Sequence, residues 1–178
     1  MSRITNEAMA KALIAARAMG LPEKEQLADE IFRVQPNLLA SVLGLPQLGV
    51  ALPKVEFALD MLLVCFLAMQ ASGQVWPLIT EDEQERQMQR LVGIVRFGAD
   101  LGAAMQARSM QQYIAGHPEK ILLAYVTTET SQWTASVRPE ASDTYVALAV
   151  LNVVNCIAFA TQPLQKKRQP VTSKTARS

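Results

Sequence analysis

Two carboxylates spaced four residues apart, Glu56 and Asp60, are the side chains in this sequence best suited to acid–base chemistry. The spacing places both on one face of a predicted helix that continues into an apolar stretch at residues 61–69. Burial could raise the pKa of one carboxyl group and let the pair exchange a proton with a ligand. A structural interpretation is favoured, because both acids follow Pro53 in the first turns of the helix. There the helix dipole stabilises negative charge, and Lys54 or an arginine elsewhere in the chain can pair with them.

A second polar pair, Asn152 and Asn155, interrupts an otherwise apolar stretch from Tyr145 to Ala160. These 16 residues are fewer than the roughly 20 that a helix needs to cross a bilayer, so we expect a buried core helix. Buried amides need hydrogen-bond partners, and their network can either fix the packing of the helix or form the floor of a small polar pocket. Both alternatives stay open. The ligand pocket would combine Glu56, Asp60, Asn152 and Asn155.

His117 is the only histidine, and its isolation excludes several chemistries. Di-iron bundles with paired Glu-x-x-His motifs need two histidines, and catalytic zinc sites need several histidine or cysteine ligands. The sequence also lacks the G-x-S-x-G motif of serine hydrolases. Cys65 and Cys156 each lie in an apolar stretch, which is typical of buried free thiols in a reducing compartment. We therefore expect no catalytic residue, no metal and no cofactor.

The segment from Thr80 to Ala115 is predicted to be one long helix, although it contains three glycines, Gly93, Gly98 and Gly102. Each glycine destabilises a helix interior by about 1 kcal/mol relative to alanine, so their presence needs a reason. Close approach of another helix to a face of small residues would supply one. We favour a partner helix within the same chain over a dimer seam, and a kink that faces a ligand is the third alternative. The face comprises Gly98, Ala99, Gly102 and Ala103.

The charge distribution argues against nucleic-acid binding. Residues 163–178 carry five basic and no acidic side chains, whereas residues 1–162 carry 12 basic and 16 acidic ones, for a net charge of −4. Residues 39–52 match the spacing of a helix-turn-helix, but Gln47 and Leu48 in its second helix cannot neutralise phosphates. We expect residues 163–178 to be a disordered, solubilising tail rather than a segment that binds lipid or RNA.

Proline, glycine and capping residues divide the chain into helical segments. Thr5 or Asn6 can cap a first helix, and Pro22, Pro53 and Pro118 can each occupy a first helical turn. The predicted helices cover residues 6–18, 22–34, 37–45, 53–71, 80–115, 118–136 and 140–161.

These elements predict one all-α domain over residues 1–162, followed by the basic tail at 163–178. Aromatic residues make up only 6% of the chain, and the remaining apolar residues favour helices over sheets. We expect a single-domain bundle of six or seven helices. The helices at 54–71 and 140–161 contain the most apolar stretches and are expected to be central and strongly buried.

The lack of catalytic motifs favours a non-enzymatic helical interaction or regulatory module, which binds a protein partner or forms a homodimer. Two alternatives remain. One is a ligand-binding or enzymatic helical bundle with a polar pocket near Asp60, Asn152 and Asn155, and the other is a peripheral membrane protein held by its basic tail. The first residues lack the apolar segment of a secretory signal, so we expect a cytoplasmic protein.

Overall fold

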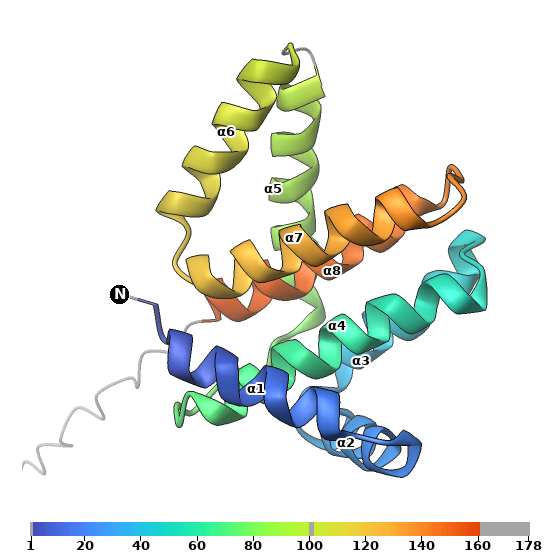
Figure 1. The fold of residues 1–178 in the computed structure, drawn as a ribbon, viewed down its shortest axis with the longest axis vertical. Coiled ribbons are helices and arrows are strands. Elements are labelled where there is room, and N and C mark those ends of the chain that lie inside the picture. Colours follow the sequence, from blue (N-terminus) through green and yellow to red (C-terminus); the bar gives the residue numbers. More distant parts are fainter. Residues whose placement is uncertain (1, 100–101, 161–178) are drawn as a thin grey trace, which may run out of the picture.

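The computed structural model describes residues 2–99 and 102–160, and all regular elements in this part of the chain are helical (Figure 1). The predicted all-α class is therefore confirmed. The predicted tail at 163–178 lies outside the described residues. In chain order the elements are α1 (Asn6–Ala18), α2 (Leu21–Val34), α3 (Pro36–Leu43), the 3-10 helix η1 (Leu45–Leu48), α4 (Leu52–Ala71), α5 (Glu81–Ala99), α6 (Ala103–Gly116), α7 (Lys120–Ser136) and α8 (Asp143–Phe159).

The described residues form eight α-helices rather than six or seven, because the expected single helix from Thr80 to Ala115 is two helices. α5 ends at Ala99 and α6 begins at Ala103. Gly102 has an extended backbone, with φ −62° and ψ 156°, and occupies the N-cap position of α6. Ending the helix before Gly102 avoids the cost of about 1 kcal/mol that a glycine carries in a helix interior. The prediction of one continuous helix is thus wrong.

Local sequence accounts for several of the helix ends. Thr5 caps α1, because its Oγ1 accepts a hydrogen bond from a first-turn amide at 3.1 Å. Pro22, Pro36 and Pro53 each lie in the first turn of a helix, where the missing N–H has no intrahelical partner to lose. The prediction is wrong for Pro118, which lies in a turn before α7. Gly49 ends η1 with φ at +81°, a left-handed conformation that glycine adopts without steric cost.

Two stretches of the described chain are buried without interruption. Every residue from 61 to 69 in α4 and from 152 to 158 in α8 is buried. α4 packs against α1, α3 and α8, and α8 also packs against α5 and α7. Burial of a large apolar side chain contributes about 1.5–3 kcal/mol, so these two stretches add strongly to the stability of the fold.

The apolar stretches around Cys65 and Cys156 hold both thiols inside the fold. Both cysteines are free and buried, as predicted. Burial raises the pKa of each thiol to about 12, so neither ionises near neutral pH. Among the described helices, none combines the length and the apolar character that crossing a membrane requires.

A hairpin made of α5 and α6 projects from the rest of the molecule (Figure 1). At its base α5 packs on α8, and α6 contacts α7. α7 and α8 run side by side, and α1 lies along α4 (Figure 1). We call α5 and α6 together the hairpin, and the remaining described residues the body.

Candidate functional site

The hairpin presents a large part of its surface to solvent. Every residue from 104 to 112 in α6 is exposed, and this stretch includes Met105 and Met110. Ile94 and Val95 in α5 are also exposed. A contiguous exposed apolar patch indicates an interaction site, whereas single exposed apolar side chains are ordinary features of a protein surface.

The predicted helix-packing or dimer seam lies at the tip of the hairpin. Gly102 is exposed, and no described atom lies within 4 Å of the position that a Cβ would take there. The described helices of this chain therefore leave Gly102 uncovered. The side-chain surroundings of Gly98, Ala99 and Ala103 lie outside the described residues.

At its base, the hairpin is fastened to α8 by the two asparagines. Asn152 Nδ2 donates to the backbone oxygen of Gln84 in α5 at 3.1 Å. Asn155 Oδ1 accepts from the hydroxyl of Tyr113 in α6 at 2.9 Å. The same oxygen lies 3.1 Å from Nε2 of His117, which directly follows α6. The two amides therefore join both legs of the hairpin to α8.

The hydrogen bonds of His117 define its tautomer. The Glu119 amide donates to Nδ1 at 3.2 Å, so the proton of the neutral ring is on Nε2 and is donated to Asn155. Burial lowers the pKa of His117, and the hydrogen bond to Asn155 and the negative charge of Glu119 offset only part of this shift. The rings of Tyr113 and Phe159 lie 5.5 and 5.8 Å from the imidazole, measured between centroids. His117 is therefore a neutral hydrogen-bonding group at the base of the hairpin.

We expect the free energy of unfolding to decrease as the pH falls below 6.5, the ordinary pKa of histidine. The unfolded chain takes up a proton there, whereas the folded chain resists protonation until the lowered pKa of His117 is reached, so protonation favours unfolding. Urea unfolding of the wild-type chain and of His117→Asn at about pH 5 and about pH 7 measures this difference. Because the chain has one histidine, the variant should lose most of the dependence. An equal dependence in both proteins would contradict the prediction.

The contact between α5 and α8 contains buried polar atoms that lack a partner. Gln87 Nε2 donates to Glu83 Oε1 at 2.6 Å. Gln87 Oε1, Asn152 Oδ1 and Gln84 Nε2 have no hydrogen-bond partner within the described part of the chain. Reversing the amide of Gln87 or Asn152 would bring two oxygens together, so a different amide orientation does not help. Each buried polar atom without a partner lowers stability by about 1–3 kcal/mol. The contact between α5 and α8 is therefore weaker than an apolar contact of the same size.

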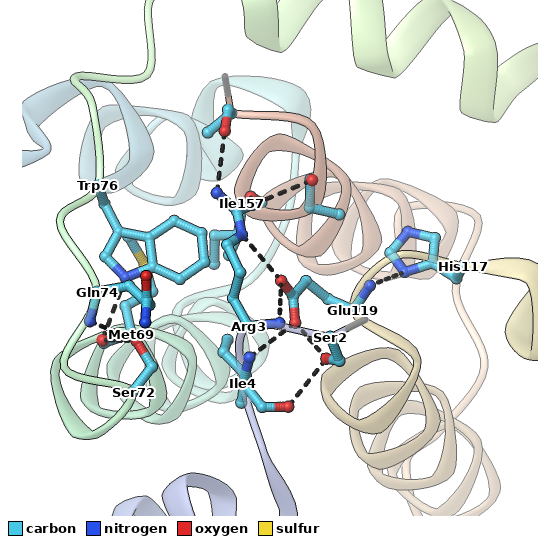
Figure 2. A network of polar contacts seen from close by, with 12 residues as sticks. Ser2, Arg3, Ile4, Met69, Ser72, Gln74, Trp76, His117, Glu119 and Ile157 are labelled. Atoms are coloured by element: carbon cyan, nitrogen blue, oxygen red, sulfur yellow. Dashed lines mark hydrogen bonds and ion pairs between the residues drawn. The ribbon is translucent and has the colours of Figure 1, made fainter. Parts of the chain in front are cut away.

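A second polar network fastens the N-terminal segment to the ends of α7 and α8 (Figure 2). Glu119 is only 1% exposed and lies at the N-cap position of α7. Its Oε2 accepts from the Ser2 hydroxyl at 2.5 Å and from the Ile4 amide at 3.0 Å. Its Oε1 accepts from the amide and from Nε of Arg3, each at 3.1 Å. Four donors thus compensate the buried carboxylate for the water it has lost.

Arg3 links this network to the C-terminal end of α8 (Figure 2). Its guanidinium donates to the backbone oxygens of Ile157, Ala158 and Ala160 at 2.6, 3.1 and 3.0 Å. These carbonyls lack intrahelical partners, and the positive charge faces the negative end of the helix dipole. The guanidinium also lies over the ring of Trp76, 3.9 Å from its centroid. Arg3 therefore caps α8 and fixes the N-terminal segment to it.

No spacing in the sequence identifies this network in advance. Arg3 and Glu119 are 116 residues apart, so neither helical periodicity nor a short motif connects them. Glu119 follows Pro118 at a predicted helix start, which indicates only a favourable charge at a helix N-terminus.

The predicted carboxylate pair lies apart from the asparagines. Asp60 forms an ion pair with Lys24 of α2, with Nζ and Oδ1 2.7 Å apart, and Glu56 is exposed. Both acids line a cavity of about 390 Å³ between α2 and α4, and neither asparagine is among the residues that line it. Lys54, the expected partner of the two acids, instead pairs with Asp143 of α8. The four side chains of the predicted ligand pocket therefore do not surround this cavity together.

The side chains gathered at the base of the hairpin are amides, a phenol and a neutral imidazole. Several of them hydrogen-bond to one another, and their observed role is to hold the hairpin against α8. Residues 2–99 and 102–160 contain no group of three or more histidine, cysteine, aspartate or glutamate side chains that could hold a metal ion. When the chain is compared with protein-family models, curated proteins and solved structures, none of them matches.

Proposed function

We propose that the protein is a non-enzymatic helical interaction module that forms a homodimer through its hairpin. The observation that carries this proposal is the exposure of α6 from residue 104 to residue 112, with Met105 and Met110 facing solvent. A helix of 14 residues is marginal in water, and most helices in proteins are stabilised by tertiary packing. A partner that covers the exposed residues of α6 would supply tertiary packing there. The body of the same chain does not cover these residues.

Charge supports a second copy as the partner. The segment from residue 86 to residue 116 contains four arginines and one aspartate, for a net charge of +3, whereas the start of α5 before it carries four acids. The rest of residues 1–162 contains eight basic and 15 acidic side chains, for a net charge of −7. Opposite charges favour docking of the hairpin of one copy on the body of the other. If each hairpin docks on the opposite body, a two-fold axis relates the copies and the assembly closes as a dimer.

Sedimentation equilibrium over a hundredfold range of protein concentration tests the proposal. We expect a reversible dimer that weakens at high salt, because screening reduces the attraction between the basic residues 86–116 of one copy and the acidic remainder of the other. The double variant Met105→Glu with Met110→Glu should weaken the dimer by about tenfold or more, since it removes apolar contact and places acids against an acidic surface.

The matched control is the double variant Val75→Glu with Leu78→Glu, which adds the same charges at exposed apolar residues of the body. This control should not weaken the dimer, because acids added to the body do not repel the arginines of residues 86–116. A wild-type chain that stays monomeric at every concentration would contradict the proposal, and so would equal effects of the two double variants.

A further inference from the structure

A cavity of about 190 Å³ lies where α1, α2, α4 and α7 meet. Its apolar lining comes from α1, from the residue that follows α1 and from α4, and includes Leu13, Met19, Met61, Leu63 and Val64. Its polar lining consists of one side chain from each of the four helices: Arg17, Lys24, Asp60 and Tyr125. An apolar cavity on which a few polar groups converge is the usual form of a small-molecule site.

Two of these polar groups are already paired with each other. Lys24 Nζ and Asp60 Oδ1 are 2.7 Å apart, with side chains 36% and 42% exposed. Lys24 and Asp60 also line the adjoining cavity of about 390 Å³, so the pair lies where the two cavities meet. Their charges cancel, and the lining of the smaller cavity keeps one net positive charge, that of Arg17.

The remaining two polar groups are hydrogen-bond donors. Among the described residues, neither the Arg17 guanidinium nor the Tyr125 hydroxyl forms an ion pair or a hydrogen bond with another side chain or with the backbone. Burial, together with the nearby carboxylate of Glu129, raises the pKa of Tyr125 to about 12, and the charge of Arg17 opposes this shift only in part. The hydroxyl is therefore protonated near neutral pH and can donate.

We infer that this cavity binds a small organic carboxylate with an apolar body. Arg17 and Tyr125 donate to the carboxylate, and the apolar body packs on Leu13, Met19 and Leu63. A cationic ligand would be repelled by Arg17, and the carboxylate of Asp60 is already paired with Lys24. A purely apolar ligand would leave the donors of Arg17 and Tyr125 without acceptors. The volume is below the range typical of drug-sized ligands, which favours a short-chain or single-ring acid. The site is separate from the hairpin and does not depend on the proposed dimer.

Titration with three probes of equal chain length tests the ligand chemistry: hexanoate, hexan-1-ol and hexylammonium. Isothermal titration calorimetry gives the affinities, and amide chemical shifts of ¹⁵N-labelled protein locate the binding. Hexanoate should bind saturably and shift the amides of α1, α4 and α7 around the cavity, and the other two probes should bind at least about tenfold more weakly. Equal or tighter binding of the alcohol or the ammonium would overturn the inference, as would the lack of saturable hexanoate binding.

Variants test the two donors. Arg17→Gln should weaken hexanoate binding by about tenfold or more, and Tyr125→Phe by several-fold, because each removes one donor to the carboxylate. Arg33→Gln is the matched control, since Arg33 is exposed on α2 and lines neither cavity. Equal affinities for the wild type and Arg17→Gln would overturn the inference. Arg17 is exposed, so this variant should keep the unfolding midpoint of the wild type, which urea unfolding checks.

Discussion

Glu119→Ala should lower the free energy of unfolding by roughly 3–5 kcal/mol, the largest effect that we expect from a single polar side chain. The Glu119 carboxylate is 1% exposed and accepts hydrogen bonds from Ser2, Arg3 and Ile4. Alanine would leave the buried Ile4 amide unpaired and would remove the charge that faces Arg3. The N-terminal segment should then detach from α7, and Arg3 would cap α8 less well. Urea unfolding at neutral pH measures the change.

The matched control for this variant is Glu85→Ala. Glu85 is exposed on α5 and accepts only from the side chain of Gln89 among the described residues, so its loss should change stability by about 0.5 kcal/mol or less. Glu119→Gln should lie between the two, because one amide oxygen can still accept while the amide nitrogen meets donors. A loss below about 1 kcal/mol for Glu119→Ala would show that water replaces the carboxylate and that the network is not essential.

Asn155→Leu should lower the free energy of unfolding by roughly 2–4 kcal/mol, and it should loosen the base of the hairpin. Asn155 Oδ1 accepts from Tyr113 and His117, and leucine would leave the buried Nε2 donor of His117 without a partner. α6 would lose its hydrogen bond to α8. Urea unfolding measures the stability, and amide hydrogen exchange measures the opening of α6, which should become faster than in the wild type.

Tyr113→Phe separates the two hydrogen bonds at Asn155. It removes only the hydroxyl that donates to Asn155, and His117 remains paired, so the expected loss is about 1 kcal/mol. Leu123→Ala serves as a comparison that affects the core of the body without touching this network, because Leu123 is fully buried in α7. It should destabilise the protein without selectively accelerating exchange in α6. If Asn155→Leu and Leu123→Ala changed exchange in α6 equally, the anchoring role of Asn155 would be refuted.

Helix formation in this chain is largely a local property, and much of it is predictable. The cap at Thr5 and the helix starts marked by Pro22 and Pro53 depend on atoms within one helical turn, so they can be recognised in the sequence. The break at Gly102 is different. The cost of glycine in a helix is known, but whether packing offsets it depends on a partner helix, and here the described helices leave Gly102 uncovered.

The partners of the polar residues are a tertiary property. Composition and periodicity predict that Asn152 and Asn155 are buried, and buried amides must find partners, but helical spacing does not reveal which ones. The sequence offers Glu56, Asp60 or the threonines of residues 125–132 as candidate partners. The asparagines instead bond to Gln84, Tyr113 and His117 at the base of the hairpin.

The sequence by itself therefore determined the all-helical class, the burial of its apolar stretches and several helix boundaries, because these follow from side chains within a few residues of each other. Only the tertiary structure decided that α8 anchors the hairpin, that Arg3 pairs with Glu119 across 116 residues of sequence, and that residues 104–112 of α6 stay exposed. The physical reason is that such contacts depend on which helices pack together. Packing selects one arrangement among many that share the same local preferences.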